Sequence, residues 1–186
     1  HDAGVAGSYR GRAYVYLGSA VGLAVSPVWT GSGDDDSGLF GHYVATAGDV
    51  NGDGYSDVIV GAYGHYAGGF GRGRAYVYLG SASGPNLNPV WTGSGDEDFA
   101  SFGYSVGTAG DVNGDGYSDV IVGAYYHDAG VAGSDRGRVY VYLGSASGLA
   151  LTPAWSGSGD QDSAFFGISV ATAGDVNGDG YSDVLV

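Results

Sequence analysis

The sequence predicts an all-β protein built from repeated four-stranded antiparallel sheets, and three observations support this. The segment "GR[AV]YVYLGSA" begins at Gly11, Gly73 and Gly137, so the chain repeats with a period of 62 and then 64 residues. Each period contains four short strand-like runs bounded by glycine or proline. No 3.6-residue periodicity is long enough to indicate a helix, and the 39 glycines would disfavour one.

The strand-like runs show how the sheets must be arranged. In the run over 138–143, Val139 and Val141 alternate with Tyr140 and Tyr142, so both faces of the strand are largely apolar. A sheet that is apolar on both faces needs cover on both, and each sheet must therefore lie between two others. Stacked four-stranded sheets at this period predict a β-propeller, because a parallel β-helix would repeat at a much shorter length. The other runs of this period lie around Trp91 and over 102–109 and 118–123.

The repeat divides the chain into three blade-equivalents with a split terminal blade. We expect one propeller segment over 1–186, with a half blade at 1–36, blades at 37–98 and 99–162, and a half blade at 163–186. Propellers need about four to eight blades, so three cannot close a ring. The sequence therefore predicts either assembly with further copies of itself, with a six-bladed homodimer as the preferred closure, or an excerpt of a longer propeller.

Composition excludes several classes of partner. The chain has 20 acidic and 6 basic residues and a net charge of −14, which disfavours nucleic acid as a ligand. It contains no cysteine, so disulfides cannot stabilise its loops. No run approaches the roughly 20 apolar residues of a membrane span, and we expect no membrane insertion. No signal peptide is visible ahead of His1, which is uninformative because such a start suits a processed chain or an excerpt.

An acidic motif, "GDVNGDGYSDV", occurs three times, at 48–58, 110–120 and 174–184. Counted from Asp49, oxygen-bearing side chains stand at positions 1, 3, 5 and 9, with Gly54 at position 6 and a backbone carbonyl available at position 7. Such a loop can surround one hard cation, and its flexible all-oxygen donors favour Ca²⁺ over Mg²⁺. The expected ligands are Asp49, Asn51, Asp53, Tyr55 and Asp57; Asp111, Asn113, Asp115, Tyr117 and Asp119; and Asp175, Asn177, Asp179, Tyr181 and Asp183.

The motif differs from an EF-hand, because Val60 stands at position 12 where a bidentate glutamate belongs and the flanks are strand-like. The alternative is a polar hairpin turn, since Asn-Gly and Asp-Gly are strong turn formers. A two-residue turn does not need four oxygen side chains at odd spacing, and the carboxylates would repel one another without a cation. The three loops contribute −9 to the net charge, and three Ca²⁺ (+6) would take the chain from −14 to −8, so we expect a structural role for the metal.

Taken together, these residues resemble a known family. Phe40-Gly41, the acidic loop, and Gly61-Ala62 after the second strand follow the order of FG-GAP repeats, which form the propeller of integrin α subunits and of many secreted bacterial proteins. One departure is that the Gly-Ala-Pro of the family reads Gly61-Ala62-Tyr63 here. The resemblance implies a propeller whose calcium loops are structural and lie on the face opposite the main ligand-binding loops.

Two classes of loop are candidates for ligand binding. The first class is the loops over 61–74 and 123–138, whose side chains combine aromatic faces with polar tips and so suit a carbohydrate or protein ligand. The second class is the acidic stretches before each Phe-Gly. The alternative is that these groups are only exposed and solubilising. The candidate side chains are Tyr63, His65, Tyr66, Tyr125, Tyr126, His127 and Asp128.

Other residues that recur in phase are expected to be structural. All six arginines lie in an Arg-Gly-Arg context, which predicts pairing with the acidic loops or capping of a neighbouring blade, with a basic binding patch as the alternative. Trp29, Trp91 and Trp155 are expected to pack between blades rather than to form sugar platforms. The arginines are Arg10, Arg12, Arg72, Arg74, Arg136 and Arg138.

Three functional classes follow from this pattern. The first is a calcium-stabilised extracellular binding or adhesion module for a protein or glycan, which the family resemblance favours. The second is a self-assembling scaffold without a ligand, natural or designed, which the near-identity of the repeats supports. The third, a hydrolase, is disfavoured because no Ser/His/Asp set recurs and His42 is replaced by Tyr104 and Ile168 in the other repeats. We therefore expect no enzymatic activity.

Overall fold

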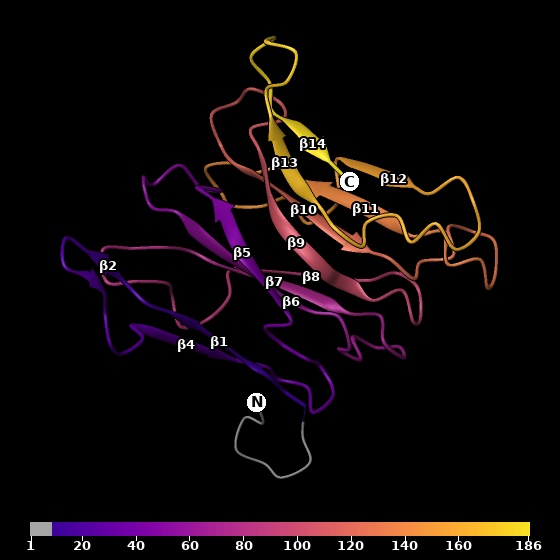
Figure 1. Ribbon diagram of the computed structural model, residues 1–186, viewed down its shortest axis with the longest axis horizontal. Coiled ribbons are helices and arrows are strands. Elements are labelled where there is room, and N and C mark those ends of the chain that lie inside the picture. The colour runs from indigo at the N-terminus through magenta and orange to yellow at the C-terminus, as the bar shows by residue number, and fades with distance from the viewer. Residues whose placement is uncertain (1–8) are drawn as a thin grey trace.

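The structure, a computed structural model, describes residues 9–186 and consists of β-strands joined by loops (Figure 1). The all-β prediction is confirmed. Among these residues, no helix has the length and apolar character needed to cross a membrane. The opening segment 1–8, where we placed the start of the first half blade, lies outside the described residues.

Two complete four-stranded antiparallel sheets form the middle of the molecule, which confirms the predicted blade. In each sheet the strands are hydrogen-bonded in the order in which they occur in the chain. The first blade consists of β5 (Tyr43–Gly48), β6 (Asp57–Ala62), β7 (Arg74–Tyr78) and β8 (Trp91–Ser94). The second blade consists of β9 (Phe102–Gly110), β10 (Asp119–Ala124), β11 (Arg138–Tyr142) and β12 (Trp155–Ser158).

Two-stranded sheets flank the complete blades. β1 (Arg12–Val15) pairs with β4 (Trp29–Ser32), and by their sequence these strands correspond to the third and fourth strands of a blade. At the other side, β13 (Ala171–Gly174) pairs with β14 (Asp183–Leu185), which correspond to the first and second strands. A short hairpin that the sequence did not predict, β2 (Gly18–Ser19) with β3 (Gly22–Leu23), follows β1.

Successive sheets are stacked face to face, as the double-sided apolar strands require (Figure 1). One buried cluster contains Val77 and Trp91 from the first blade together with Phe102 and Val122 from the second. The first strands of neighbouring sheets lie side by side, because β5 contacts β9 and β9 contacts β13. These three strands run in the same direction, so their ends define the two ends of the molecule (Figure 1).

Trp29 and Trp91 pack between blades, as predicted, but Trp155 does not: it is 48% exposed, because the β13–β14 sheet beside it consists of two strands and offers it no third-strand tyrosine. The ring of Trp29 meets Tyr78 edge-on, with 4.8 Å between centroids, and its indole N–H donates to the carbonyl of Asn86 at 2.9 Å. Trp91 makes the same pair of contacts with Tyr142 and Ala150 in the second blade. Such edge-on pairs contribute about 0.5–1.5 kcal/mol beyond the area they bury.

The Phe-Gly turns bring neighbouring blades into close backbone contact. Gly61, at the end of β6, lies so near to the Phe-Gly turn of the next blade that a Cβ placed on it would be 2.0 Å from the carbonyl oxygen of Gly103. Gly123 approaches Gly167 in the same way. Phe102 itself is fully buried and forms a bridge to Gly73. A glycine is needed at position 61 because no side chain fits between the two backbones.

Candidate functional site

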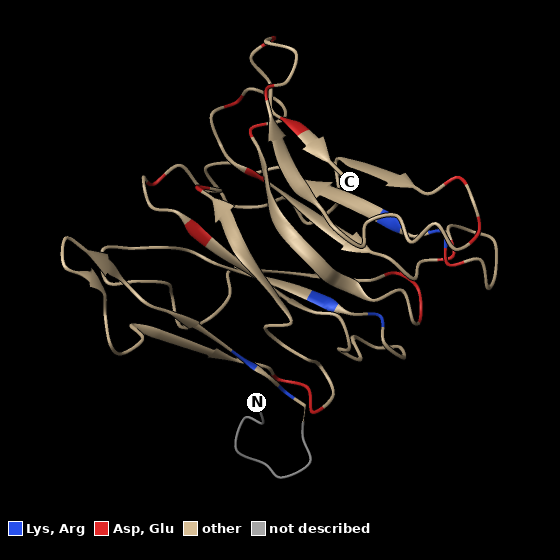
Figure 2. Cartoon of the chain, in the orientation of Figure 1, with Lys and Arg blue, Asp and Glu red and all other residues tan. Residues whose placement is uncertain are grey.

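The three acidic loops lie at one end of the molecule, where the first strands β5, β9 and β13 end (Figure 2). In the first loop, the carboxylate of Asp49 accepts hydrogen bonds from the backbone N–H groups of Gly52 (2.7 Å), Asp53 (3.1 Å) and Gly54 (2.8 Å). Asn51 donates to the carboxylate of Asp53 at 2.9 Å. The loops at 111–119 and 175–183 repeat these contacts. The expected ligand residues of each loop are thus brought together around its first aspartate.

Asp57, the ninth residue of the first loop, has a further role that the sequence did not show. Its side chain is buried, and its two oxygens accept hydrogen bonds from the backbone N–H groups of Val50 and Gly80, both at 2.8 Å. Because Gly80 follows β7, Asp57 ties the loop to the third strand of its blade. Asp119 makes the equivalent bonds to Val112 and Gly144.

Neighbouring loops also contact one another. The carbonyl of Asp49 accepts a 2.9 Å hydrogen bond from the N–H of Ser118, and that of Asp111 accepts one from Ser182. The ring of Tyr117 lies against Gly52, where an added Cβ would be 2.7 Å from it. The tyrosine at position 7 therefore packs on the preceding loop with its side chain, while its carbonyl is the group we expect to bind a cation.

The donor chemistry of these loops fits a hard cation. Burial raises the pKa of Asp57, and although hydrogen bonds from Gly80 and Val50 oppose this, the charges of Asp53 and Asp49 add to it. The three carboxylates therefore repel one another, and a cation would relieve this repulsion. Among residues 9–186, no three carboxylate or histidine side chains converge closely enough to hold a metal by themselves. The cation would also require the Asn51 amide oxygen and a backbone carbonyl.

A row of aromatic side chains lies at the opposite end of the blades. We call His42, Tyr63, Tyr104, Tyr125, Tyr126 and Phe165 the aromatic row. Each lies near the start of a first strand or just after a second strand, which is the end away from the acidic loops. Successive ring centroids along the row are 4.0–5.7 Å apart, from His42–Tyr63 at one side to Tyr126–Phe165 at the other. The residues of the row are half-buried to exposed, so each of them is partly accessible to a ligand.

A second group of aromatics lies farther out at the same end. Tyr66, Phe70 and Phe99 are exposed, with Phe70 and Phe99 stacked at 6.1 Å and nearly parallel. Phe99 also adopts a left-handed backbone conformation, with φ of 65°. Sequence reasoning selected Tyr66 but missed Phe70 and Phe99, because they lie on different loops and neither recurs in phase.

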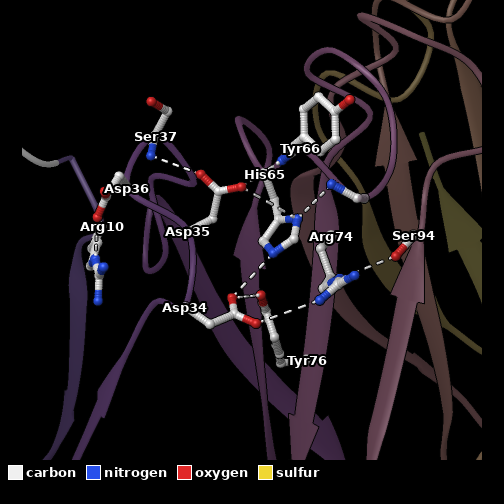
Figure 3. A network of polar contacts seen from close by, with 11 residues as sticks. Arg10, Asp34, Asp35, Asp36, Ser37, His65, Tyr66, Arg74, Tyr76 and Ser94 are labelled. Carbon is white, nitrogen blue, oxygen red and sulfur yellow. Dashed lines mark hydrogen bonds and ion pairs between the residues drawn. The ribbon is translucent and has the colours of Figure 1, made fainter.

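His65 and His127 are not available to a ligand, which corrects our expectation from the sequence. Both are buried, and each joins two neighbouring sheets. Figure 3 shows the contacts of His65. Nε2 of His65 is 3.2 Å from Asp34, on the loop that follows β4, and the hydroxyl of Tyr76 donates to the same carboxylate at 2.6 Å. In the next blade His127 and Tyr140 contact Asp96 in the same way. We call each such set an interblade clasp.

The hydrogen bonds of the clasp determine which nitrogen of the histidine carries the proton. The backbone N–H of Ala67 donates to Nδ1 of His65 at 2.8 Å, so Nδ1 is an acceptor and Nε2 donates to Asp34. Burial lowers the pKa of His65, and the charge of Arg74 lowers it further. Burial acts to raise the pKa of Asp34, but the hydrogen bond from Tyr76 and the nearby positive charges leave it below its ordinary value.

The acidic stretches before each Phe-Gly are also engaged within the protein. These stretches contain the Asp-x-Asp triplets 34–36, 96–98 and 160–162. The last aspartate of a triplet pairs with an arginine of its own sheet, as Asp98 does with Arg72 at 2.6 Å and Asp162 with Arg136 at 3.0 Å. Arg74 instead reaches Asp34 of the preceding sheet at 3.5 Å. The predicted pairing of arginines with acidic segments is confirmed for these residues, and their partners lie in the stretches before Phe-Gly rather than in the loops at 49–57, 111–119 and 175–183. The carboxylate of Asp128 likewise accepts hydrogen bonds within its own loop, from residues 133–135.

Stacked four-stranded blades with acidic loops at one end and aromatic side chains at the other define a β-propeller repeat protein. The FG-GAP repeat model matches residues 40–78, 102–142 and 166–186, which is more than half of the chain. The chain belongs to the FG-GAP repeat family.

Integrin α chains are among the curated proteins that resemble this chain. The chain is 35% identical to integrin alpha-IIb of Mus musculus over 166 residues (83% of this chain) and 31% identical to integrin alpha-5 of Xenopus laevis over 184 residues (93%). It is 35% identical to integrin alpha-6 of Gallus gallus over 173 residues (88%). It spans only 14–17% of the length of these three relatives.

Proposed function

We propose that this chain is an adhesion-type binding module that works outside the cell, with three structural Ca²⁺ ions at one end and a protein or glycan ligand at the other. The observation that carries the proposal is the aromatic row, which runs continuously across both complete blades. Aromatic rings with polar tips offer stacking faces and hydrogen bonds together, as protein and sugar ligands require.

The calcium part of the proposal is supported by the three acidic loops and by their contacts with one another. Each loop gathers two carboxylates and an amide oxygen around a glycine turn, and the loops are linked through Asp49 to Ser118 and through Asp111 to Ser182. A cation in one loop would therefore stiffen its neighbour. Hydrogen-bonded linkage of this kind favours a structural role over a catalytic one, and we propose a binding function rather than an enzymatic one.

The relatives support the location and the class of function. The likeness to integrin α chains favours an adhesion role at or outside the cell surface, where calcium is plentiful enough to fill such loops. Integrin α chains are much longer than this chain, so their whole activity is not assigned to it.

Binding to a glycan array and to a panel of immobilised extracellular-matrix proteins in calcium buffer tests the proposal. We expect a ligand whose binding falls at least tenfold in Tyr126→Ala and in Tyr63→Ala. Leu87→Ala is the control, because Leu87 is 86% exposed and lies on the loop between β7 and β8, at the acidic-loop end. Binding that weakens equally in the control, or no binding by the folded wild type, would contradict the proposal and favour the scaffold alternative.

A further inference from the structure

Three exposed aromatic residues lie together on the loops of the first complete blade, farther out than the aromatic row. We call Tyr66, Phe70 and Phe99 the outer platform; they are 52%, 63% and 66% exposed. The rings of Phe70 and Phe99 are nearly parallel, with 6.1 Å between centroids and 10° between planes, and Tyr66 meets Phe70 edge-on at 5.7 Å. Three large apolar groups are therefore gathered on the surface, outside the buried core.

The second blade builds the same pair of loops with serines in place of the two phenylalanines. In the first blade, the N–H of Phe99 donates to the carbonyl of Phe70, which joins the loop between β6 and β7 to the stretch after β8. In the second blade, the N–H of Ser163 donates to the carbonyl of Ser134 at 2.6 Å in the same way. Ser134 and Ser163 are thus the structural equivalents of Phe70 and Phe99, and the loop pair forms without aromatic rings.

The two phenylalanines are therefore not needed for the fold, and their placement is unfavourable for an isolated chain. Phe99 has a φ of 65°, in the left-handed region that bulky residues rarely occupy, where Ser163 has a φ of 59°. The two positions also differ from the second blade as a pair, because each phenyl ring has the other as its neighbour. Paired exposed rings on a strained backbone indicate a contact with something outside the chain.

An ion pair lies beside the two phenyl rings and is accessible to the same ligand. Nε of Arg72 is 2.6 Å from Oδ1 of Asp98, and the two side chains are 33% and 44% exposed. The pair lies over Gly69, the residue before Phe70, where an added Cβ would be 2.0 Å from Oδ1 of Asp98. Among residues 9–186 the pair is made through Nε and Oδ1, so the terminal nitrogens of Arg72 and Oδ2 of Asp98 can bond a ligand.

The charges around the outer platform favour a neutral ligand. The net charge of −14 repels an anionic one. The carboxylates beside the rings already have partners, because Asp98 pairs with Arg72. Asp35 accepts hydrogen bonds from the backbone N–H groups of Ser37 and Tyr66 (Figure 3). A cationic ligand would have to replace these bonds, whereas a neutral ligand with hydroxyl groups can add to them, since a hydroxyl both donates and accepts.

We propose that the outer platform binds a neutral glycan, with the apolar face of one sugar ring on Phe70 and Phe99 and two adjacent hydroxyls bonded to Arg72 and Asp98. One hydroxyl accepts from the guanidinium group and its neighbour donates to the carboxylate. A protein ligand that covered the rings would also remove water from the ion pair, which is unfavourable without new hydrogen bonds. The outer platform shares no residue with the aromatic row, so this site goes beyond the proposed function.

Titration calorimetry of the full chain in calcium buffer tests this site, with neutral oligosaccharides ending in glucose, galactose, mannose or N-acetylglucosamine. The wild type should bind at least one of them. The double variant Phe70→Ser, Phe99→Ser should bind it at least tenfold more weakly, and it should fold because the second blade already carries serine at both places. Arg72→Lys should also weaken binding, since lysine keeps the charge and loses the planar fork. Val131→Ser, an exposed apolar residue on the equivalent loop of the second blade, is the control and should bind normally.

Three results would overturn the proposal: no binding of any neutral oligosaccharide by the folded wild type, unchanged binding by the double variant, or tighter binding of sialylated than of neutral glycans. Loss of an immobilised protein ligand in the double variant, without any glycan binding, would make the platform a protein contact instead. Circular dichroism establishes that each variant is folded. Tyr126→Ala is titrated in parallel, so that a ligand lost only in this variant supports the proposed function at the aromatic row and not the outer platform.

Discussion

The hydroxyl of Tyr76, on β7, donates a 2.6 Å hydrogen bond to Asp34, which lies on the loop that ends the preceding sheet. The same bond joins Tyr140 to Asp96 at 2.8 Å. Neighbouring blades are thus joined by apolar packing along the strands and by a charged hydrogen bond at the aromatic end. In each clasp, a tyrosine and a histidine of one blade both contact the same carboxylate oxygen of the preceding sheet. The clasp therefore positions each blade relative to the one before it.

Tyr76→Phe should lower the stability of the fold by about 1–2 kcal/mol, because a hydrogen bond to a charged group is lost while the ring packing is kept. Urea unfolding followed by tryptophan fluorescence measures the change. Tyr43→Phe is the control, since Tyr43 is more exposed and lies outside the clasp. Equal losses in the two variants would show that the bond to Asp34 adds no stability.

Stability should fall as the pH is lowered from 7 to 5. The pKa of His65 is lowered from 6.5 in the folded state by burial, so the unfolded chain binds the proton more readily. The contribution of neutral His65 is therefore complete above pH 6.5 and is lost as the pH falls towards its folded pKa. Melting temperatures measured in excess chelator, which removes any effect of metal, should show this decrease.

His65→Gln tests whether this residue is the cause. The variant should be less stable than the wild type at pH 7, and its melting temperature should change less between pH 7 and pH 5. A wild-type decrease that persists unchanged in the variant would assign the effect to other groups. Asp96 adds a separate loss at lower pH, since the hydrogen bond from His127 holds its pKa well below 3.8 and its contribution disappears as the carboxylate is protonated.

Calcium should raise the melting temperature of the wild type, and the triple variant Asp53→Ala, Asp115→Ala, Asp179→Ala should lose that increase. These side chains are exposed, so in chelator the triple variant should melt close to the chelated wild type. Calorimetric titration should give three ions per wild-type chain. A wild-type melting temperature that does not respond to calcium would contradict the structural role of the metal.

Asp57→Asn separates the backbone role of Asp57 from its proposed role as a ligand. Asp57 accepts two backbone hydrogen bonds, and an amide can accept only one of them through oxygen. The variant should therefore lose about 1–3 kcal/mol even in chelator, unlike Asp53→Ala. Thermal melts of both variants with and without calcium make the comparison, and equal behaviour in chelator would count against the structural role of Asp57.

Gly61→Ala should destabilise the fold by about 1–3 kcal/mol or more, because its Cβ would be 2.0 Å from the carbonyl oxygen of Gly103 and neither backbone can move freely. Gly107→Ala is the matched control in the neighbouring blade, since no atom lies within 4 Å of an added Cβ there. Urea unfolding measures the stability of both variants. Similar losses of stability in the two would mean that the two backbones can separate at Gly61.

The sequence by itself determined the repeat, the four strands of each blade, the places of the acidic loops and the pairing of arginines with acidic stretches. These features follow from short-range patterns that recur in phase, such as the alternation around Tyr140 and the spacing of aspartates from Asp49, because strand periodicity and loop chemistry are local.

Only the tertiary structure decided which of the candidate side chains are free. His65 contacts Asp34, which is 31 residues away and on another sheet, so no local pattern could show that it is buried. The stacking of Phe70 on Phe99 and the alignment of Tyr104 with Tyr125 likewise depend on how blades lie against each other. Blade stacking brings together residues that the chain keeps far apart, and the exposed or buried state of a loop side chain is determined at that level.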